Sequence, residues 1–163
     1  MVSGMSDKSI SSLSRMLRVL DLFTDTNAIW SAEAIAQALD VSVPTSYRYV
    51  KLLAEAGLLQ RSAESQFRLG PRIITLDHFM RVSDPVLQHA LSFMQELVEK
   101  TGFDCVLTGL YGNQVIDTHR EYSSNPAELH YGRGRPRPLF LGGAPKVVLA
   151  NLAPPALHNL FDQ

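Results

Sequence analysis

Apolar residues in the first quarter of the chain recur at the spacing of α-helices. Between residues 13 and 23 they form a stripe along one side of a helix, at Leu13, Met16, Leu17, Leu20 and Phe23. The later segment SAEAIAQAL begins with Ser31, a good N-cap, and places Ile35 and Leu39 on one side. The pattern therefore predicts two helices that are separated by the polar stretch TDTNAI.

A third helix follows the second after an interruption of only three residues. Asp40 tolerates the positive φ that a tight turn needs, and Ser42 is a good N-cap for the next helix. Pro44 would lie in the first turn, where backbone N–H groups lack partners within the helix. We expect this helix to end at Gly57, because glycine readily adopts the left-handed conformation.

Two short alternating runs, LLQRS and QFRLG, come next and are separated by SAES. This pattern is typical of a small β-hairpin, in which we expect Leu58, Phe67 and Leu69 to point inward. Three helices followed by a hairpin form a winged helix-turn-helix, with the second and third helices joined by the tight turn.

The pattern changes again in the second half of the chain. RIITLDHFM predicts a connecting helix, and PVLQHALSFMQELVEKTG predicts a strongly amphipathic one that ends at Gly102. VLTGLY and QVIDTHRE flank a Gly-Asn turn, which favours a β-hairpin. KVVLANL predicts the start of a further helix that Pro154 and Pro155 interrupt.

These elements predict an N-terminal all-α, winged helix-turn-helix domain with a small hairpin wing, then a linker helix and an α+β domain. The expected boundaries are a disordered start at 1–9, the DNA-binding domain at 10–70, the linker helix at 71–83 and the second domain at 84–163. Within the first domain the helix-turn-helix covers about 31–56 and the wing 58–70. Two or three strands make a marginal sheet, so the second domain is expected to be incomplete or to need a partner chain.

Composition and charge narrow the classes of protein. A net charge of −1 and a pI near 6.5 exclude a broad basic coat for nucleic acid, so local charge must decide. No apolar run approaches the roughly 20 residues that span a bilayer, and the cytoplasm is the expected compartment. Cys105, the only cysteine, cannot form an intrachain disulfide and is expected to be a small buried group in a strand.

The third helix is the main candidate for a functional surface. Tyr49, Val50 and Leu53 share one face with Ser46 and would pack inward. The opposite face carries an aromatic hydroxyl, a guanidinium fork and an ammonium group, which suit base edges and phosphates. With the basic hairpin beside it, this helix predicts DNA binding by Ser42, Pro44, Thr45, Ser46, Tyr47, Arg48, Lys51, Arg61 and Arg68.

The sequence gives little indication of metal binding, cofactor binding or catalysis. The five histidines (78, 89, 119, 130 and 158) include no pair at the i, i+4 spacing of a helical metal site, so we expect no metal. No cofactor is expected, and no combination of nucleophile, base and orienting group suggests an enzyme.

Two groups of charged residues in the second half of the chain can be interpreted in more than one way. Asp117, His119, Arg120 and Glu121 are most simply the solvated edge of a strand. The alternating arginines 133, 135 and 137 are most simply a solvent-facing loop, with an anionic effector or a neighbouring subunit as the sharper interpretation.

Three stretches, SLSRMLRVLDLF, AEAIAQALDVSVPTSYRYVKLLAEAGLLQR and FRLGPRIITL, resemble successive pieces of an IclR-type transcriptional regulator. The later stretch PLFLGGAPKVVLA resembles part of that family's effector domain, although Phe140 stands where the family usually has His, and Gly142 and Pro145 also depart from its pattern. The resemblance runs over nearly the whole chain from about residue 10. Family members are longer, so it implies a GAF-like effector-binding domain of which only the first part is present.

The resemblance implies sequence-specific DNA binding by a homodimer or tetramer, with transcription modulated by a small molecule. Dimers paired through the first helix and the linker helix would place their third helices in successive major grooves of a nearly palindromic operator. In that arrangement Thr45, Tyr47 and Arg48 meet base edges or nearby phosphates, Lys51 a phosphate, and Arg68 the minor groove or backbone. One wall of the effector pocket is expected at Leu139, Phe140, Leu141, Gly142, Gly143 and Ala144.

The residues alone leave two other classes of protein open. The first is another winged-helix regulator, such as the MarR type, which pairs through terminal helices and lacks a β-rich second domain. The second is a sensor or enzyme whose winged helix binds protein rather than DNA.

Overall fold

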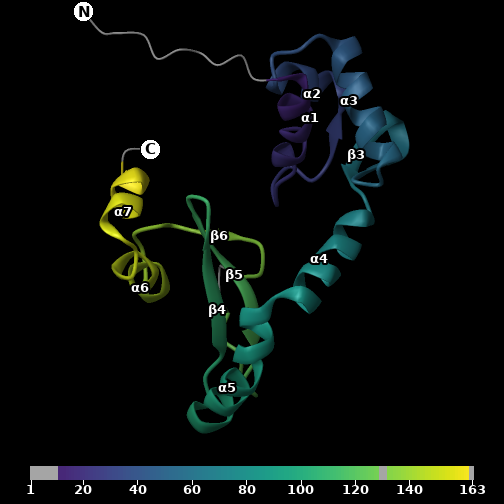
Figure 1. Cartoon of the computed structure of the whole chain (residues 1–163). Coiled ribbons are helices and arrows are strands. Elements are labelled where there is room, and N and C mark those ends of the chain that lie inside the picture. The colour runs from purple at the N-terminus through teal and green to yellow at the C-terminus, as the bar shows by residue number, and fades with distance from the viewer. Residues whose placement is uncertain (1–10, 129–131, 162–163) are drawn as a thin grey trace, which may run out of the picture. The chain divides into compact units, whose positions relative to one another are not determined.

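The chain folds into two compact units that divide between Arg81 and Val82 (Figure 1). This computed structural model describes residues 11–128 and 132–161. The segment 1–9, expected to be disordered, lies outside the described residues. Each unit is described separately below.

The first unit is a winged helix-turn-helix, as the sequence predicts. Its helix-turn-helix consists of α2 (Ala32–Ala38) and α3 (Val43–Glu55). The strands β2 (Leu59–Arg61) and β3 (Gln66–Leu69) form the antiparallel hairpin of the wing. The remaining elements are α1 (Ser12–Leu17), the 3₁₀ turns η1 (Leu20–Leu22) and η2 (Ala63–Ser65), β1 (Trp30–Ser31) and α4 (Arg72–Ser83).

The wing contains a third strand that the sequence pattern does not predict. β1 pairs antiparallel with β3, with Trp30 opposite Phe67, and gives the sheet the order β1-β3-β2. The Trp30 indole donates a hydrogen bond to the carbonyl oxygen of Leu22, 2.9 Å away. Two residues are too few to show an alternating pattern, so only the tertiary pairing defines this strand.

The first helix is shorter than predicted. It ends at Leu17, and the chain then tightens into η1 through bonds such as Leu22 N–H to the carbonyl of Val19. Because of this change Val19 is fully buried, whereas Leu13 is 68% exposed and Leu17 is 55% exposed. The predicted apolar stripe is therefore only partly the face that enters the core.

The core of the first unit is formed by α2, α3 and the hairpin, together with the residue before η1. It consists of Val19, Ala32, Ile35, Tyr49, Val50, Leu53, Leu59 and Phe67. In the hairpin Phe67 is buried as predicted, and Leu58 packs against the core while partly exposed. Leu69 is 43% exposed, so the prediction that it points inward is wrong; Leu59, opposite Leu69 in the ladder, is buried instead.

The second unit is an α+β arrangement. Helix α5 (Pro85–Thr101) is followed by β4 (Cys105–Tyr111) and β5 (Gln114–Glu121), joined by the predicted Gly-Asn turn. β6 (Pro136–Arg137) completes an antiparallel sheet of order β4-β5-β6, and α6 (Gly143–Ala150) and α7 (Pro154–Phe161) follow. Gly102 ends α5 at φ +70° in the left-handed region, as expected.

Two details of the second unit differ from the sequence-based expectation. Pro154 and Pro155 begin α7 rather than merely interrupting a helix, because proline is tolerated in a first turn. Cys105 is only half-buried. In the described part of the chain, no helix is long and apolar enough to cross a membrane.

Candidate nucleic-acid interface

The turn between α2 and α3 fixes the start of the candidate helix. Asp40 adopts φ +51°, as predicted, and the Val41 N–H donates to the carbonyl of Ala36 at 3.0 Å. Ser42 caps α3 by accepting from the Thr45 N–H at 3.4 Å, and the two hydroxyl groups lie 2.8 Å apart. With Pro44 in the first turn, the exposed N-terminal end of α3 is held by local bonds.

One face of α3 anchors the helix in the core. Tyr49, Val50 and Leu53 are each at most 3% exposed. Ser46 is fully buried, and its hydroxyl donates to the carbonyl oxygen of Ala32 at 2.7 Å. The prediction that Ser46 contacts DNA is therefore corrected: its side chain fastens α3 to the first turn of α2 and is not accessible to a nucleic acid.

The opposite face of α3 is exposed and carries the predicted polar groups. Tyr47 is 46% exposed, and its hydroxyl donates to the Glu33 carboxylate at 2.7 Å. The Arg48 guanidinium lies 5.9 Å from the centre of the Tyr49 ring. Lys51 stands 3.9 Å from Glu55, an exposed pair of the kind that contributes little to stability. All three side chains are thus accessible to a large partner.

The hydrogen bond between Tyr47 and Glu33 changes the acidity of both groups. Donation by the Tyr47 hydroxyl lowers the pKa of the Glu33 carboxyl below its ordinary value, with backbone and Ser31 bonds adding to the effect. The same bond raises the pKa of Tyr47, and the charge of Arg61 partly opposes that rise. Glu33 is therefore a carboxylate at neutral pH.

The wing places two further cations on the surface. Arg61 donates to the Ser65 hydroxyl at 2.9 Å, and Arg68 donates to the Gln60 side chain at 3.4 Å. Both arginines are exposed. Arg61 is the strand residue next to the hairpin turn, and its positive charge slightly opposes the rise in the pKa of Tyr47.

Glu33 is the residue of this surface that was not among the sequence-based candidates. Glu33 lies in the first turn of α2, where the helix dipole favours acidic groups whether or not they contact a partner. Its contact with Tyr47, fourteen residues away, depends on how α2 and α3 pack. No local pattern in the sequence indicates that contact.

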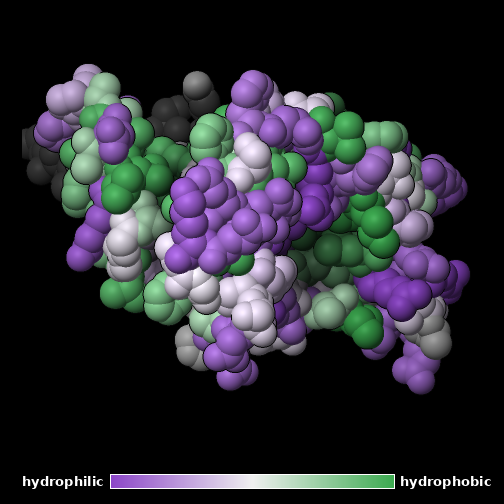
Figure 2. Space-filling model, turned by 90° about the horizontal axis from the view of Figure 1, so that it is seen from below, coloured by the Kyte–Doolittle hydropathy of each residue, from purple (hydrophilic) through white to green (hydrophobic). Residues whose placement is uncertain are grey.

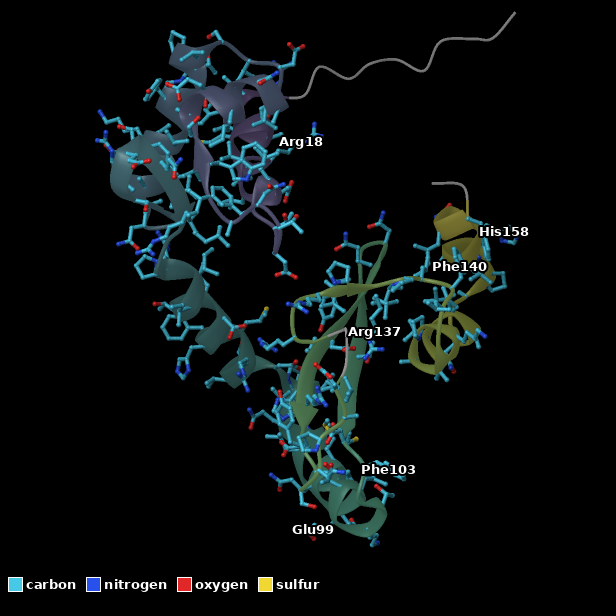
Figure 3. All side chains as sticks on the ribbon, turned by 180° about the vertical axis from the view of Figure 1, so that it is seen from behind. Arg18, Glu99, Phe103, Arg137, Phe140 and His158 are labelled. Carbon is cyan, nitrogen blue, oxygen red and sulfur yellow. The ribbon has the colours of Figure 1, made fainter. Side chains whose placement is uncertain are left out.

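In the second unit, the Asp117 side chain is a buried ionic centre rather than part of a solvated strand edge. Asp117 is 2% exposed and accepts two hydrogen bonds from Arg137, each at 2.6 Å, and one from Thr108 at 2.8 Å (Figure 3). Arg133 donates to the carbonyl of Thr118. The expectation of a solvent-facing arginine loop is therefore wrong for Arg133 and Arg137, while Arg135 is exposed.

A second ionic cluster fastens the segment after β5. Asp104 pairs with Arg120 and accepts from the backbone N–H groups of Ser123 and Ala127 at 2.7 and 3.0 Å. The Arg120 guanidinium also lies 4.7 Å from the centre of the Tyr122 ring. Arg120 and then the Ser123 N–H hold the pKa of Asp104 well below its ordinary value.

The predicted effector-pocket wall lies in the turn before α6 and in the start of that helix. Phe140 is 52% exposed and stacks on Phe161 with ring centres 5.0 Å apart. Leu141 is 64% exposed, and Gly142 precedes α6 at φ +87°. An open hollow of about 500 Å³ in this unit is lined by Leu110, Gly112, Asn113, Leu152, Ala156, Asn159 and Leu160. It includes none of the six predicted residues, whose role stays a prediction.

Within residues 11–128 and 132–161, no three His, Cys, Asp or Glu side chains lie close enough together to hold a metal ion. His119 pairs with Glu121 at 2.6 Å, and His89 and His158 each contact a carbonyl of their own helix. His130 lies outside the described residues.

The fold and the exposed helix define a winged helix-turn-helix protein with a second, α+β unit. Comparison with known proteins relates the helix-turn-helix of this chain to one family. Residues 12–63 match the IclR helix-turn-helix domain. The chain is 28% identical over 151 residues to the probable transcriptional regulator SauR of Cupriavidus necator, covering 91% of this chain and 59% of that protein. It is 27% identical to the HTH-type transcriptional regulator XynR of Escherichia coli, covering 94% and 61%.

Solved structures agree on the fold. An IclR family transcriptional regulator from Brucella abortus matches with a TM-score of 0.80 and 18% identity over 99% of this chain and 62% of that one. An IclR homolog from Microbacterium hydrocarbonoxydans, complexed with 4-hydroxybenzoate, matches with a TM-score of 0.73 and 21% identity over 94% and 64%. The chain contains an IclR-type helix-turn-helix domain at residues 12–63, and it is similar in fold to IclR-family transcriptional regulators. It spans about 60% of the length of these curated relatives.

Proposed function

We propose that the chain binds double-stranded DNA at specific sequences and regulates transcription in the cytoplasm. The observation that carries the proposal is the exposed face of α3, which presents Tyr47, Arg48 and Lys51 while its other face is fixed in the core. A helix held in this way can enter a major groove without losing its own packing.

The groups on this surface divide between sequence reading and positioning. Arg48 has the guanidinium geometry that grips guanine through two hydrogen bonds. Lys51 is one turn farther along α3 and suits a phosphate, as do Arg61 and Arg68 in the wing. Ser42, Pro44 and Thr45 form the helix start that approaches the backbone or base edges.

Two copies of the chain would bind a nearly palindromic operator. Exposed apolar side chains on α1 and α4 support pairing through those helices, since Leu13, Leu17, Ile74 and Phe79 are all more than half exposed. Large exposed apolar groups of this kind commonly mark protein–protein contacts. Such a dimer would place two α3 helices about 34 Å apart, in successive major grooves.

A small molecule would modulate this binding through the second unit. The relative from Microbacterium hydrocarbonoxydans was crystallised with 4-hydroxybenzoate, which supports a small organic ligand for proteins of this fold. The turn at 139–144 forms one wall of the site in this proposal, and tight binding would need further walls beyond it.

Selection of bound genomic fragments, followed by mobility shift at rising salt, tests the proposal. We expect enrichment of a palindromic sequence and a steep fall of affinity with salt, because cations that contact phosphates release counterions. Failure to enrich any sequence would contradict it. Retention of a protein partner with no DNA binding would instead favour a winged helix that recognises protein.

A further inference from the structure

The Glu33 carboxylate lies on the same surface as the cations of α3, and the fold holds it there. The buried hydrogen bond from Ser46 to the carbonyl of Ala32 fixes the first turn of α2 against α3. Glu33 and Tyr47 are the next residues along each helix, and they meet outside that buried bond at 2.7 Å. The buried bond between Ser46 and Ala32 therefore positions the exposed bond between Tyr47 and Glu33.

An acid on a DNA-facing surface has a restricted choice of partners. An ionised carboxylate accepts hydrogen bonds and donates none. It therefore repels phosphates and the acceptor edges of bases. In the major groove the donors are the amino groups of cytosine N4 and adenine N6, and Glu pairs with the cytosine amino group. Such an acid therefore favours some base pairs and opposes all others.

We propose that Glu33 is a specificity-determining residue that accepts a hydrogen bond from a base amino group, that of cytosine, while Tyr47 holds its carboxylate in place. The inference rests on the proposed DNA-binding function. Tyr47 donates to Oε1 of the exposed carboxylate, and an ionised carboxylate has about four acceptor sites, so this bond alone does not prevent a further donor from approaching. Tyr47 is then a positioning residue for Glu33 as well as part of the contact surface.

The surrounding charges support this role. The exposed cations Arg48, Lys51 and Arg61 attract the phosphate backbone, so the surface can approach DNA despite the acid. The carboxylate then lowers affinity for every site that lacks a correctly placed amino group.

The test compares the unchanged 163-residue chain with Glu33→Gln, Tyr47→Phe and the matched control Glu55→Gln. Glu55 is an exposed acid at the end of α3, and its replacement removes the same charge outside the proposed contact. Dissociation constants are measured at one salt concentration on the selected operator, on single-base variants and on scrambled DNA.

For Glu33→Gln we expect tighter binding to scrambled DNA and a fall of about tenfold in discrimination at one base pair of each half-site. Tyr47→Phe should lower discrimination at the same base pair by a smaller factor. Glu55→Gln should raise affinity for all sequences by one common factor.

A Glu33→Gln variant that behaves like Glu55→Gln would overturn the inference while the DNA-binding function stands. Failure of the unchanged chain to bind any DNA would overturn both. Loss of discrimination at a base pair without a cytosine would reject the proposed partner.

Discussion

The two units of the chain place their charged residues in opposite ways. In the first unit the cations of α3 and the wing are exposed, and their contacts are single bonds such as Arg61 to Ser65. In the second unit Asp117 is 2% exposed and is held by Arg137 and Thr108. The same residue types therefore contribute to a surface in one unit and to internal structure in the other.

The surface view follows from the same contrast. Figure 2 shows hydrophilic residues gathered over much of one face, with hydrophobic groups exposed among them. An exposed charge is well solvated, so its removal changes stability little. A buried ion pair behaves differently, because loss of one partner leaves the other charge without compensation. Substitutions should therefore affect binding in the first unit and stability in the second.

The largest effect is expected for Asp117→Ala. Arg137 would keep its charge in a site that is mostly closed to water, so the second unit should lose about 3 to 5 kcal/mol of unfolding free energy. Urea denaturation followed by circular dichroism measures that loss. Trp30, the only tryptophan, lies in the first unit, so its fluorescence transition should not move.

The matched control for that experiment is Glu99→Ala, an exposed acid on α5 (Figure 3). It should change the unfolding free energy by less than about 0.5 kcal/mol. If the urea unfolding transition of Asp117→Ala coincided with that of Glu99→Ala, the proposed contrast between the two units would be wrong.

Arg48→Ala should have the largest effect on binding in the first unit. Loss of a guanidinium that grips a base should cost about 1 to 3 kcal/mol on the operator and flatten sequence preference. The Trp30 fluorescence transition should stay in place, because the side chain is exposed. Mobility shift on operator and scrambled DNA measures the difference.

Lys51→Ala provides the comparison for Arg48. It should weaken binding to all sequences and reduce the salt dependence by about one unit of slope. Equal losses on operator and scrambled DNA for Arg48→Ala would show that Arg48, too, contacts only phosphate.

The contrast also explains what the sequence predicts well. Helix-turn-helix features are local: Asp40 in the turn, Ser42 as a cap and Gly57 as a stop each act within a few residues. The structure has all three, with Gly57 at φ +73°. The amphipathic pattern of α3 likewise separates the buried Tyr49 from the exposed Arg48. Fold class and the main surface follow from such patterns.

Features that depend on distant residues are not predicted. Asp117 and Arg137 are twenty residues apart and meet because the two-residue strand β6 pairs with β5. Alternation along β5 alone cannot reveal that partner, so the strand edge was expected to be solvated. Ser46 differs, because the helical pattern already places it on the inward face with Tyr49; only its bonding partner, the carbonyl of Ala32 on another helix, is not predicted.

Ser46→Ala tests the correction for that residue. The buried carbonyl of Ala32 would lose one hydrogen bond, so the first unit should lose about 1 kcal/mol of stability. Trp30 fluorescence during urea denaturation measures the loss. Discrimination between operator and scrambled DNA should change less than for Glu33→Gln, because Ser46 does not reach the surface and acts on Glu33 only through the first turn of α2. A loss of discrimination without a loss of stability would restore Ser46 as a contact.

The smallest expected effect is the pH dependence that Asp104 adds to the second unit. Its pKa is depressed in the folded state, chiefly by Arg120, so its contribution to stability is complete above the unfolded pKa near about 3.9. That contribution is lost as pH falls toward the folded value, because the unfolded chain then binds the proton more readily. The unfolding free energy of the second unit should therefore fall between about pH 5 and about pH 3.

Asp104→Asn isolates this contribution, because asparagine keeps a similar shape and does not titrate. The variant should be less stable than the unchanged chain at neutral pH but should lose less stability on acidification, as circular dichroism during urea denaturation would measure. The Trp30 transition again serves as the reference, since Asp104 is not part of the first unit. Equal acid sensitivity of the two chains would show that the pairing of Asp104 with Arg120 does not differ between the folded and unfolded states. The internal charges of the second unit would then resemble the exposed ones of the first.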